Sequence, residues 1–336
     1  MAELHSHSPT RRRARCASAL VLVALVGATA RADDVPGTPT PVPQKAQPTG
    51  STQTIAPTVG AEGHSEHGSL AEVGAKLSNP ISDVWAMFTQ FGLTFSDGNV
   101  NAGDPKVAGN MIFEPVLPIP LYGEGDKEWR MIVRPSIPVL FGNKVPTGPN
   151  SFDSQTGLGD MLLPLPIAAP LGNWLLALGP TFTFPTSTKD AFGRQQYAVG
   201  PTGIFGYKTK EWVAGVFPQY WFGVGSRGND QGSTPDSSNM ELLYFFYYNL
   251  PNAWQVGSNP TITYDNKATS GNRWNVPIGL TIAKTTKILG RPVKFQFGME
   301  YSVVSQDDFG QRFQIKLNVI PVIQSLIKKP LFGGGG

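Results

Sequence analysis

The chain has 336 residues, of which 40% are hydrophobic and 15% charged, and it contains 38 glycines and 30 prolines. This composition excludes an intrinsically disordered chain and a bundle of transmembrane helices. Short strands joined by turns fit it better than long helices do.

Residues 1–32 have the pattern of a cleavable export signal. Four arginines within 11–15 precede a short run of small and aliphatic residues, and a small-x-small sequence stands at 30–32. The run is shorter than the roughly 17 residues of a membrane-spanning helix, which disfavours the alternative of a membrane anchor. Cleavage would remove five of the 27 basic and one of the 24 acidic residues. The remaining 22 basic and 23 acidic residues leave no excess of positive charge for binding a nucleic acid.

Residues 33–76 are predicted to be a disordered periplasmic tether, because they are rich in Pro, Thr, Ser, Gly and Gln. His64 and His67 form a His-x-x-His pair that a metal could bind. The pair lies in a predicted flexible tail without a cysteine ligand, so we interpret it as solvated linker and expect no metal site.

A short amphipathic helix is predicted within 77–89. Asn79 suits an N-cap and Pro80 suits the first turn. The apolar residues that follow recur at i, i+3, i+4 and i+7: Ile81, Val84, Trp85 and Phe88. Such a helix could lie at the inner membrane–water boundary, sit in the mouth of a barrel, or pack without any functional role.

From residue 90 to 323 the hydrophobic pattern has period two, which predicts strands with one apolar and one polar face. Most segments are near the 9–11 residues that a tilted strand needs to cross a membrane. The fold class is therefore all-β, a transmembrane antiparallel up-and-down β-barrel. About twelve strands are predicted: 90–95, 109–119, 129–140, 157–169, 173–185, 196–207, 211–222, 240–250, 254–265, 273–283, 291–303 and 311–323.

The connections between these strands alternate between short turns and long polar loops. Alternation of this kind is typical of outer-membrane barrels and places the N- and C-termini, including the tail 324–336, on the periplasmic side. Tryptophans stand at the starts of four strands on the short-turn side and predict an aromatic girdle there: Trp129, Trp174, Trp212 and Trp254. Prolines recur inside the predicted strands, where each removes a ladder donor.

A series of motifs spread over 77–323 resembles a bacterial outer-membrane family of putative transporters, labelled MetA-pathway of phenol degradation. The motifs are Leu77–Asp83 (LSNPISD), Gly157–Asp160 (GLGD), Gly179-Pro180 with Pro185-Thr186, Gly200-Pro201, Trp274–Ile278 (WNVPI) and Gly290–Val293 (GRPV). The resemblance implies a barrel and suggests transport. This chain departs from the family at its end, where residues 323–332 and four glycines follow the last strand instead of a terminal aromatic.

Charged residues on the polar parity of the strands should line the barrel interior, because Arg or Lys facing lipid costs roughly 2–4 kcal/mol at mid-bilayer. The predicted lumen-lining and permeant-contacting residues are Glu114, Arg130, Arg134, Asp160, Lys294, Glu300, Arg312 and Lys316. They could form a mixed-charge constriction that selects permeants, or ion pairs that fill a narrow interior. Twelve strands lie between barrels filled by side chains and open porins, which predicts a partly occluded lumen.

An enzyme is not expected, because all four histidines precede the barrel and no catalytic residue can be named. The hypothesis is a channel for passive passage of small, aromatic or hydrophobic, solutes in the bacterial outer membrane. Its expected partners are outer-membrane lipid, the permeant and the barrel assembly machinery, with no cofactor. The alternative is a structural or adhesive surface barrel that binds partners through its long loops.

Overall fold

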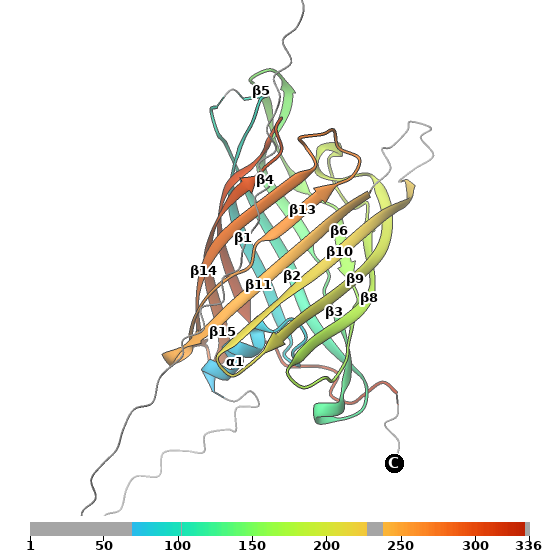
Figure 1. Cartoon of the computed structure of the whole chain (residues 1–336), viewed down its shortest axis with the longest axis vertical. Coiled ribbons are helices and arrows are strands. Elements are labelled where there is room, and N and C mark those ends of the chain that lie inside the picture. Colours follow the sequence, from blue (N-terminus) through green and yellow to red (C-terminus); the bar gives the residue numbers. More distant parts are fainter. Residues whose placement is uncertain (1–68, 102, 227–237, 333–336) are drawn as a thin grey trace, which may run out of the picture. The chain divides into compact units, whose positions relative to one another are not determined.

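The computed structural model describes residues 69–101, 103–226 and 238–332. They form a single antiparallel sheet that closes into a barrel, because β1 (Ala86–Asp97) pairs with both β2 (Lys106–Tyr122) and β16 (Gly310–Pro321) (Figure 1). The predicted signal peptide and the tether up to residue 68 lie outside the described residues. Within the described ranges, no helix has the length and apolar character needed to span a membrane.

The strands follow one another around the barrel in chain order, each antiparallel to its neighbours. Three of the twelve crossings are interrupted and so appear as more than one element, namely β3 with β4, β5 to β7, and β12 with β13. The predicted all-β up-and-down barrel of twelve strands with one N-terminal helix is confirmed. The other elements are α1 (Leu70–Ser78), η1 (Gly125–Lys127), β3 (Trp129–Val133), β4 (Ile137–Gly148), β5 (Ser151–Leu158), β6 (Met161–Pro164), β7 (Ile167–Ala168), β8 (Trp174–Phe184), η2 (Asp190–Phe192), β9 (Gln196–Lys208), β10 (Trp212–Ser226), β11 (Ser238–Leu250), η3 (Pro251–Ala253), β12 (Trp254–Ser258), β13 (Thr261–Asp265), β14 (Trp274–Ile288) and β15 (Arg291–Val304).

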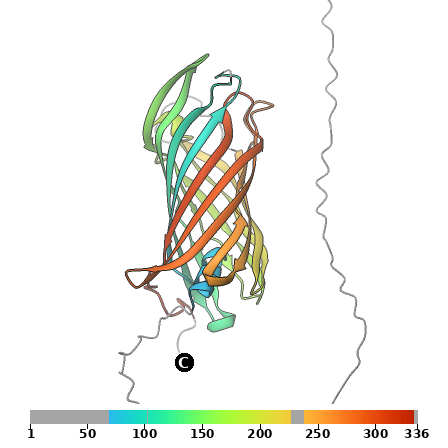
Figure 2. The ribbon, with the colours of Figure 1, turned by 90° about the vertical axis from the view of Figure 1, so that its left-hand side faces the viewer.

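Proline accounts for three of the four breaks, and the fourth, between β5 and β6, falls at Gly159 and Asp160. Pro135, Pro166 and Pro260 lie between β3 and β4, β6 and β7, and β12 and β13, respectively. Each lacks the N–H that would continue the ladder. Neighbouring strands still reach across, because the Ile132 N–H donates to the Pro166 carbonyl at 2.9 Å and the Tyr244 N–H to the Pro260 carbonyl at 3.2 Å. The tilted strands therefore close the wall despite these breaks (Figure 2).

The barrel buries its polar face and exposes its apolar face. On β15, Lys294 and Glu300 are 1% and 5% exposed, whereas Met299, Tyr301 and Val303 are about half exposed. A water-soluble domain shows the opposite distribution. An apolar outer surface around a polar interior suits a hydrocarbon environment, where every backbone group must be paired within the sheet.

The predicted position of the helix, 77–89, is wrong, because α1 lies earlier in the chain, at Leu70–Ser78. Ser69 caps α1 by accepting a hydrogen bond from the Glu72 backbone N–H at 3.2 Å, and Glu72 and Lys76 suit the two helix ends. Asn79 is the C-cap rather than the N-cap, because the residue before proline disfavours helical backbone. Residues 70–76 of the predicted tether are therefore helical.

The apolar residues after α1 pack as a turn and the start of β1. Ile81, Val84 and Trp85 are buried, and the Trp85 indole donates to the Pro118 carbonyl at 2.9 Å. Their spacing resembles a helical stripe, but β1 already begins at Ala86. The spacing of the apolar residues alone could not distinguish a helix from a turn followed by a strand, because contacts with the barrel wall decide between the two.

Helix α1 lies inside the short-turn end of the barrel (Figures 1 and 2) and contacts β14, β15 and η3. Val73 is fully buried, and a Cβ added at Gly74 would come within 2.6 Å of the Thr285 hydroxyl. Lys294 donates to the Ser78 hydroxyl at 2.5 Å, and that hydroxyl donates to the Gln255 amide oxygen at 3.1 Å. Packing and hydrogen bonds therefore fix α1 against the inner wall.

One further segment differs from the sequence prediction, and the predicted tail makes contacts that the prediction did not address. The predicted connection between the strands 129–140 and 157–169 is largely β-structure, because β4 runs to Gly148 and β5 starts at Ser151, and together they form a hairpin at the long-loop end (Figure 1). In the predicted tail, the backbone N–H groups of Leu331 and Phe332 donate to the carbonyls at the end of β2. The tail thus contacts the short-turn end of the barrel.

Candidate functional site: the barrel cavity

A cavity of about 640 Å³ occupies the barrel interior beyond α1. Its floor includes Leu77 and Ser78 of α1 and the turn that follows. Its walls come from inward-facing residues of strands around the whole barrel, so no single loop forms it. A space of this size is in the range of sites for small molecules.

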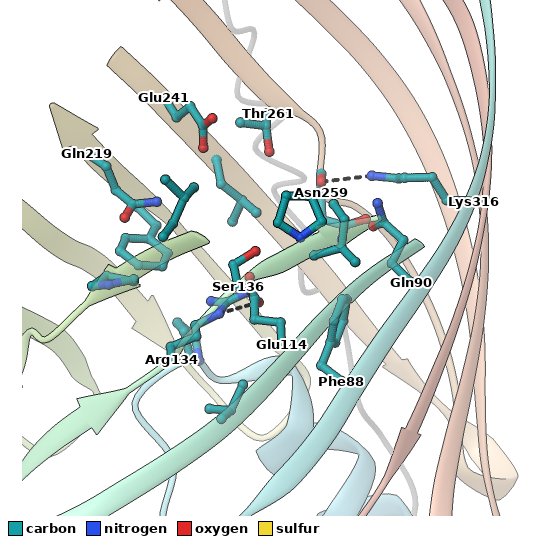
Figure 3. Close-up of a pocket in the computed structure, with 18 of the residues that line it drawn as sticks. Phe88, Gln90, Glu114, Arg134, Ser136, Gln219, Glu241, Asn259, Thr261 and Lys316 are labelled. Carbon is teal, nitrogen blue, oxygen red and sulfur yellow. Dashed lines mark hydrogen bonds and ion pairs between the residues drawn. The ribbon is translucent and has the colours of Figure 1, made fainter. Parts of the chain in front are cut away.

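Two ion pairs lie on the cavity wall. Figure 3 draws the pair of Arg134 and Glu114, and it shows Lys316 on another part of the wall. Arg134 pairs with Glu114 from the neighbouring strand, and Lys316 pairs with Glu300. Lys316 also lies 3.4 Å from the backbone carbonyl of Asn259. All four charged side chains are at least four-fifths buried. Pairing offsets the desolvation cost of burying these charges.

The remaining wall is divided between apolar and amide-rich surfaces. The apolar part is formed mainly by β2, β6, β10 and β11: Val116, Leu162, Phe217, Leu243 and Phe245. The amide-rich part includes Asn259, whose side-chain oxygen accepts from Gln296 at 3.1 Å and from the Thr281 hydroxyl at 3.1 Å. A solute in the cavity would therefore meet both kinds of surface.

A row of polar side chains crosses four adjacent strands at one level of the cavity. The strand register places Gln219 opposite Glu241, Glu241 opposite Thr263, and Thr263 opposite Asn275. All four line the cavity. Cross-strand partners on one face lie about 4.5–5.5 Å apart, so the row forms a continuous polar surface.

Five of the eight residues predicted to line the lumen do line this cavity, and three do not. The five are Glu114, Arg134, Asp160, Glu300 and Lys316. Asp160 accepts hydrogen bonds from the backbone N–H groups of Ser187 at 3.1 Å and Arg194 at 2.7 Å. It therefore also holds the loop between β8 and β9. Whether these five residues contact a permeant stays a prediction.

The prediction was wrong for three residues, which do not line the cavity: Arg130, Lys294 and Arg312. Arg130 lies at the short-turn end, where it pairs with Glu128. Lys294 faces inward but is covered by α1 and is 1% exposed. A bulge shifts the register so that Ser96 is opposite Gln311 and Phe95 is opposite Phe313, which leaves Arg312 as the extra residue. The bulge reverses the parity there, and Gln311 lines the cavity instead.

The sequence interpretation did not single out the amide residues of the wall. Gln219, Gln296 and Asn275 occupy the inward parity of strands whose outward residues are apolar. Their alternation with apolar residues is the sequence signal that could have identified them. The prediction assigned charged residues to the interior from the cost of exposing a charge to lipid, and this cost does not apply to neutral amides.

The four tryptophans of the predicted girdle lie at the short-turn ends of their strands. Trp174 is 63% exposed, Trp129 and Trp254 are also exposed, and Trp212 is half-buried. Tyr207 bridges two of them, with ring centroids 4.9 Å from Trp174 and 5.9 Å from Trp212. A role at a membrane interface stays a prediction.

Comparison with solved structures finds other barrels. The chain resembles the COG4313 outer membrane channel from Pseudomonas putida F1, with a TM-score of 0.53, 12% identity, and coverage of 71% of this chain and 96% of that chain. It also matches the Pseudomonas putida toluene transporter TodX, with a TM-score of 0.33, 11% identity and coverage of 74% and 92%. A third match is a BenF-like porin from Pseudomonas fluorescens Pf-5, with a TM-score of 0.24, 8% identity and coverage of 72% and 99%.

No protein-family model matches the sequence, and no curated protein matches it. The family label suggested by the motifs therefore stays a prediction. At 12% identity, the likeness to the first structure shows the fold alone, which is a closed β-barrel.

Proposed function

We propose that the chain is a bacterial outer-membrane channel for passive passage of small solutes, including aromatic and other hydrophobic ones. The observation that carries this proposal is the cavity of about 640 Å³, lined by apolar and polar side chains, inside a wall with an apolar outer surface. A barrel that served only as a scaffold would gain stability by filling this volume.

The apolar exterior supports placement in the outer membrane. Leu178, Ile278 and Leu280 are all more than half exposed, and all point away from the cavity. Contiguous apolar surface of this extent is unfavourable in water but matched by lipid tails. By the loop pattern, the short-turn end with α1 faces the periplasm.

Two measurements test the channel proposal together. We expect stepwise conductance when the full-length chain is reconstituted in a planar bilayer, and faster entry of small aromatic solutes into liposomes that contain it. Heat-modifiable gel mobility of the same sample verifies that the barrel is folded. A folded barrel that is silent in both assays would falsify the transport proposal.

The hairpin of β4 and β5 supports the alternative function, a surface barrel that binds partners. Its two strands extend the sheet at the long-loop end and present the exposed residues Ser151 and Asp153. Deletion of the segment between Gly142 and Thr156 separates the two functions. Lost surface binding with unchanged conductance would favour the alternative, and unchanged binding would favour the channel.

A further inference from the structure

The polar row across β10, β11, β13 and β14 contains one carboxylate that no cation neutralises. Within the described part of the chain, Glu241 has no ion pair, whereas Glu114 and Glu300 are both paired with cations. In Figure 3 Glu241 points into the cavity beside Thr261, with no drawn interaction. The formal charges of Glu114, Arg134 and Glu241 sum to minus one.

The amide atoms of the cavity wall that lack a hydrogen bond are acceptors, as the oxygens of the Glu241 carboxylate are. Among the described residues that line the cavity, each buried amide atom without a hydrogen bond is an acceptor oxygen, on Asn110, Asn239 and Asn275. Asn275 is only 7% exposed and ends the polar row that begins at Gln219. Buried polar atoms are normally paired, so these three oxygens lack the donor that a folded protein usually supplies.

The surface next to Glu241 is apolar. Leu243 and Phe245 follow Glu241 on the same inward face of β11, and Phe217 lies opposite Leu243 on β10. A bound molecule that placed a cation at Glu241 would therefore rest its body on aliphatic and aromatic side chains. Charged hydrogen bonds of this kind are stronger than neutral ones.

From this arrangement we propose that the row Glu241–Thr263–Asn275 is a binding site for small amphipathic ammonium solutes, with N–H donors on the polar row and an apolar body against β10 and β11. This proposal rests on the proposed channel function and specifies the class of solute. It differs from selection by ring hydrophobicity alone, because a molecule of equal size that lacks N–H or O–H donors would leave the acceptors unpaired. Loss of such pairing is the main source of discrimination between otherwise similar ligands.

The test measures block of potassium chloride conductance by three probes in the full-length chain. 2-Phenylethylammonium provides charge and donors, benzyltrimethylammonium provides charge alone, and 3-phenylpropionate is an anion of similar size. We expect the first to block at a concentration at least about tenfold lower than the other two. Equal potency of the three probes would overturn the proposal.

Matched variants assign the effect to the row. Glu241→Gln and Asn275→Leu should each weaken block by 2-phenylethylammonium, Glu241→Gln by about tenfold, which corresponds to about 1.4 kcal/mol. Glu211→Gln removes the same charge at an exposed turn outside the cavity and should leave block unchanged. Wild-type block in both row variants would contradict the site.

Titration calorimetry of the same probes in detergent distinguishes failure of the site from failure of the channel. Binding of 2-phenylethylammonium that depends on Glu241, in a barrel without conductance, would refute the channel and support the site. Conductance without selective binding or block would refute the site and leave the channel proposal in place.

Discussion

The two ends of the barrel interior use polar side chains differently. At the short-turn end, Lys294, Ser78 and Gln255 form a chain of hydrogen bonds, and the Lys294 ammonium lies 4.8 Å from the centre of the Tyr247 ring. In the cavity, Glu241 has no ion pair and the oxygen of Asn275 has no donor among the described residues. The first group of side chains is satisfied within the protein, whereas the second group, on the proposal above, would be satisfied by a bound solute.

The largest loss of stability is expected when one partner of a buried ion pair in the cavity wall is removed. Lys316→Met leaves Glu300, which is 5% exposed, without its cation, and removing one partner of a buried pair typically destabilises by roughly 3–5 kcal/mol. Urea unfolding of the barrel in lipid vesicles, followed by gel mobility, measures this loss. The double variant Lys316→Met with Glu300→Gln should recover most of the stability. A double variant as unstable as the single one would contradict the assignment of the loss to the unpaired carboxylate.

Lys294 and Ser78 test whether the short-turn end is purely structural. Ser78→Ala removes the hydroxyl that accepts from the buried ammonium, so we expect a destabilisation of about 1–3 kcal/mol. Lys294→Met removes the charge with little change in volume and should be close to neutral. Protease accessibility of residues 70–78 and urea unfolding report both effects. If the two variants behaved alike, the ammonium would not be what Ser78 stabilises.

Asn275→Leu provides the contrast within the cavity. The amide oxygen has no hydrogen bond in the structure, so replacing it by an apolar side chain of similar size should change stability by less than about 0.5 kcal/mol. The same urea unfolding assay measures this change. A large loss of stability would show that the cavity row, like the short-turn end, serves folding.

A pH-dependent effect of at most modest size concerns the contact between α1 and the turn that follows it. Burial raises the pKa of Asp83, but the charge and hydrogen bond of Lys76 at 3.2 Å, a backbone hydrogen bond and the charge of Arg130 together hold the pKa below its ordinary value of 3.8. The pair therefore stabilises α1 above pH 3.8, and this contribution is lost as the pH falls through the lowered pKa. Both side chains are at least one-third exposed, so the contribution is at most about 1 kcal/mol.

Protease accessibility of α1 measured between pH 6 and pH 3 checks this dependence. We expect accessibility to rise only below about pH 4 in the wild type, in keeping with the lowered carboxyl pKa. Lys76→Met should remove most of that pH dependence. A rise centred near neutral pH would instead point to another titrating group.

One sequence signal does predict the observed position of the helix, although the spacing of apolar residues pointed elsewhere. Ser69 followed by Glu72 is a capping-box sequence, and it stands before the apolar residues of α1. Pro80 served as the start of a helix in the prediction, although a proline ends the preceding helix equally well. The choice depended on whether Trp85 packs in a helix or a turn, and its bond to the Pro118 carbonyl is a long-range contact.

The sequence by itself determined the closed twelve-strand barrel, its up-and-down order and the inward parity of residues such as Lys316, because the alternation of side chains along a strand is a local property. Only the tertiary structure decided that α1 covers Lys294, that a bulge turns Arg312 out of the cavity lining, and that Glu241, Thr263 and Asn275 share one level. These outcomes depend on register between strands and on packing across the interior, which join residues far apart in the chain.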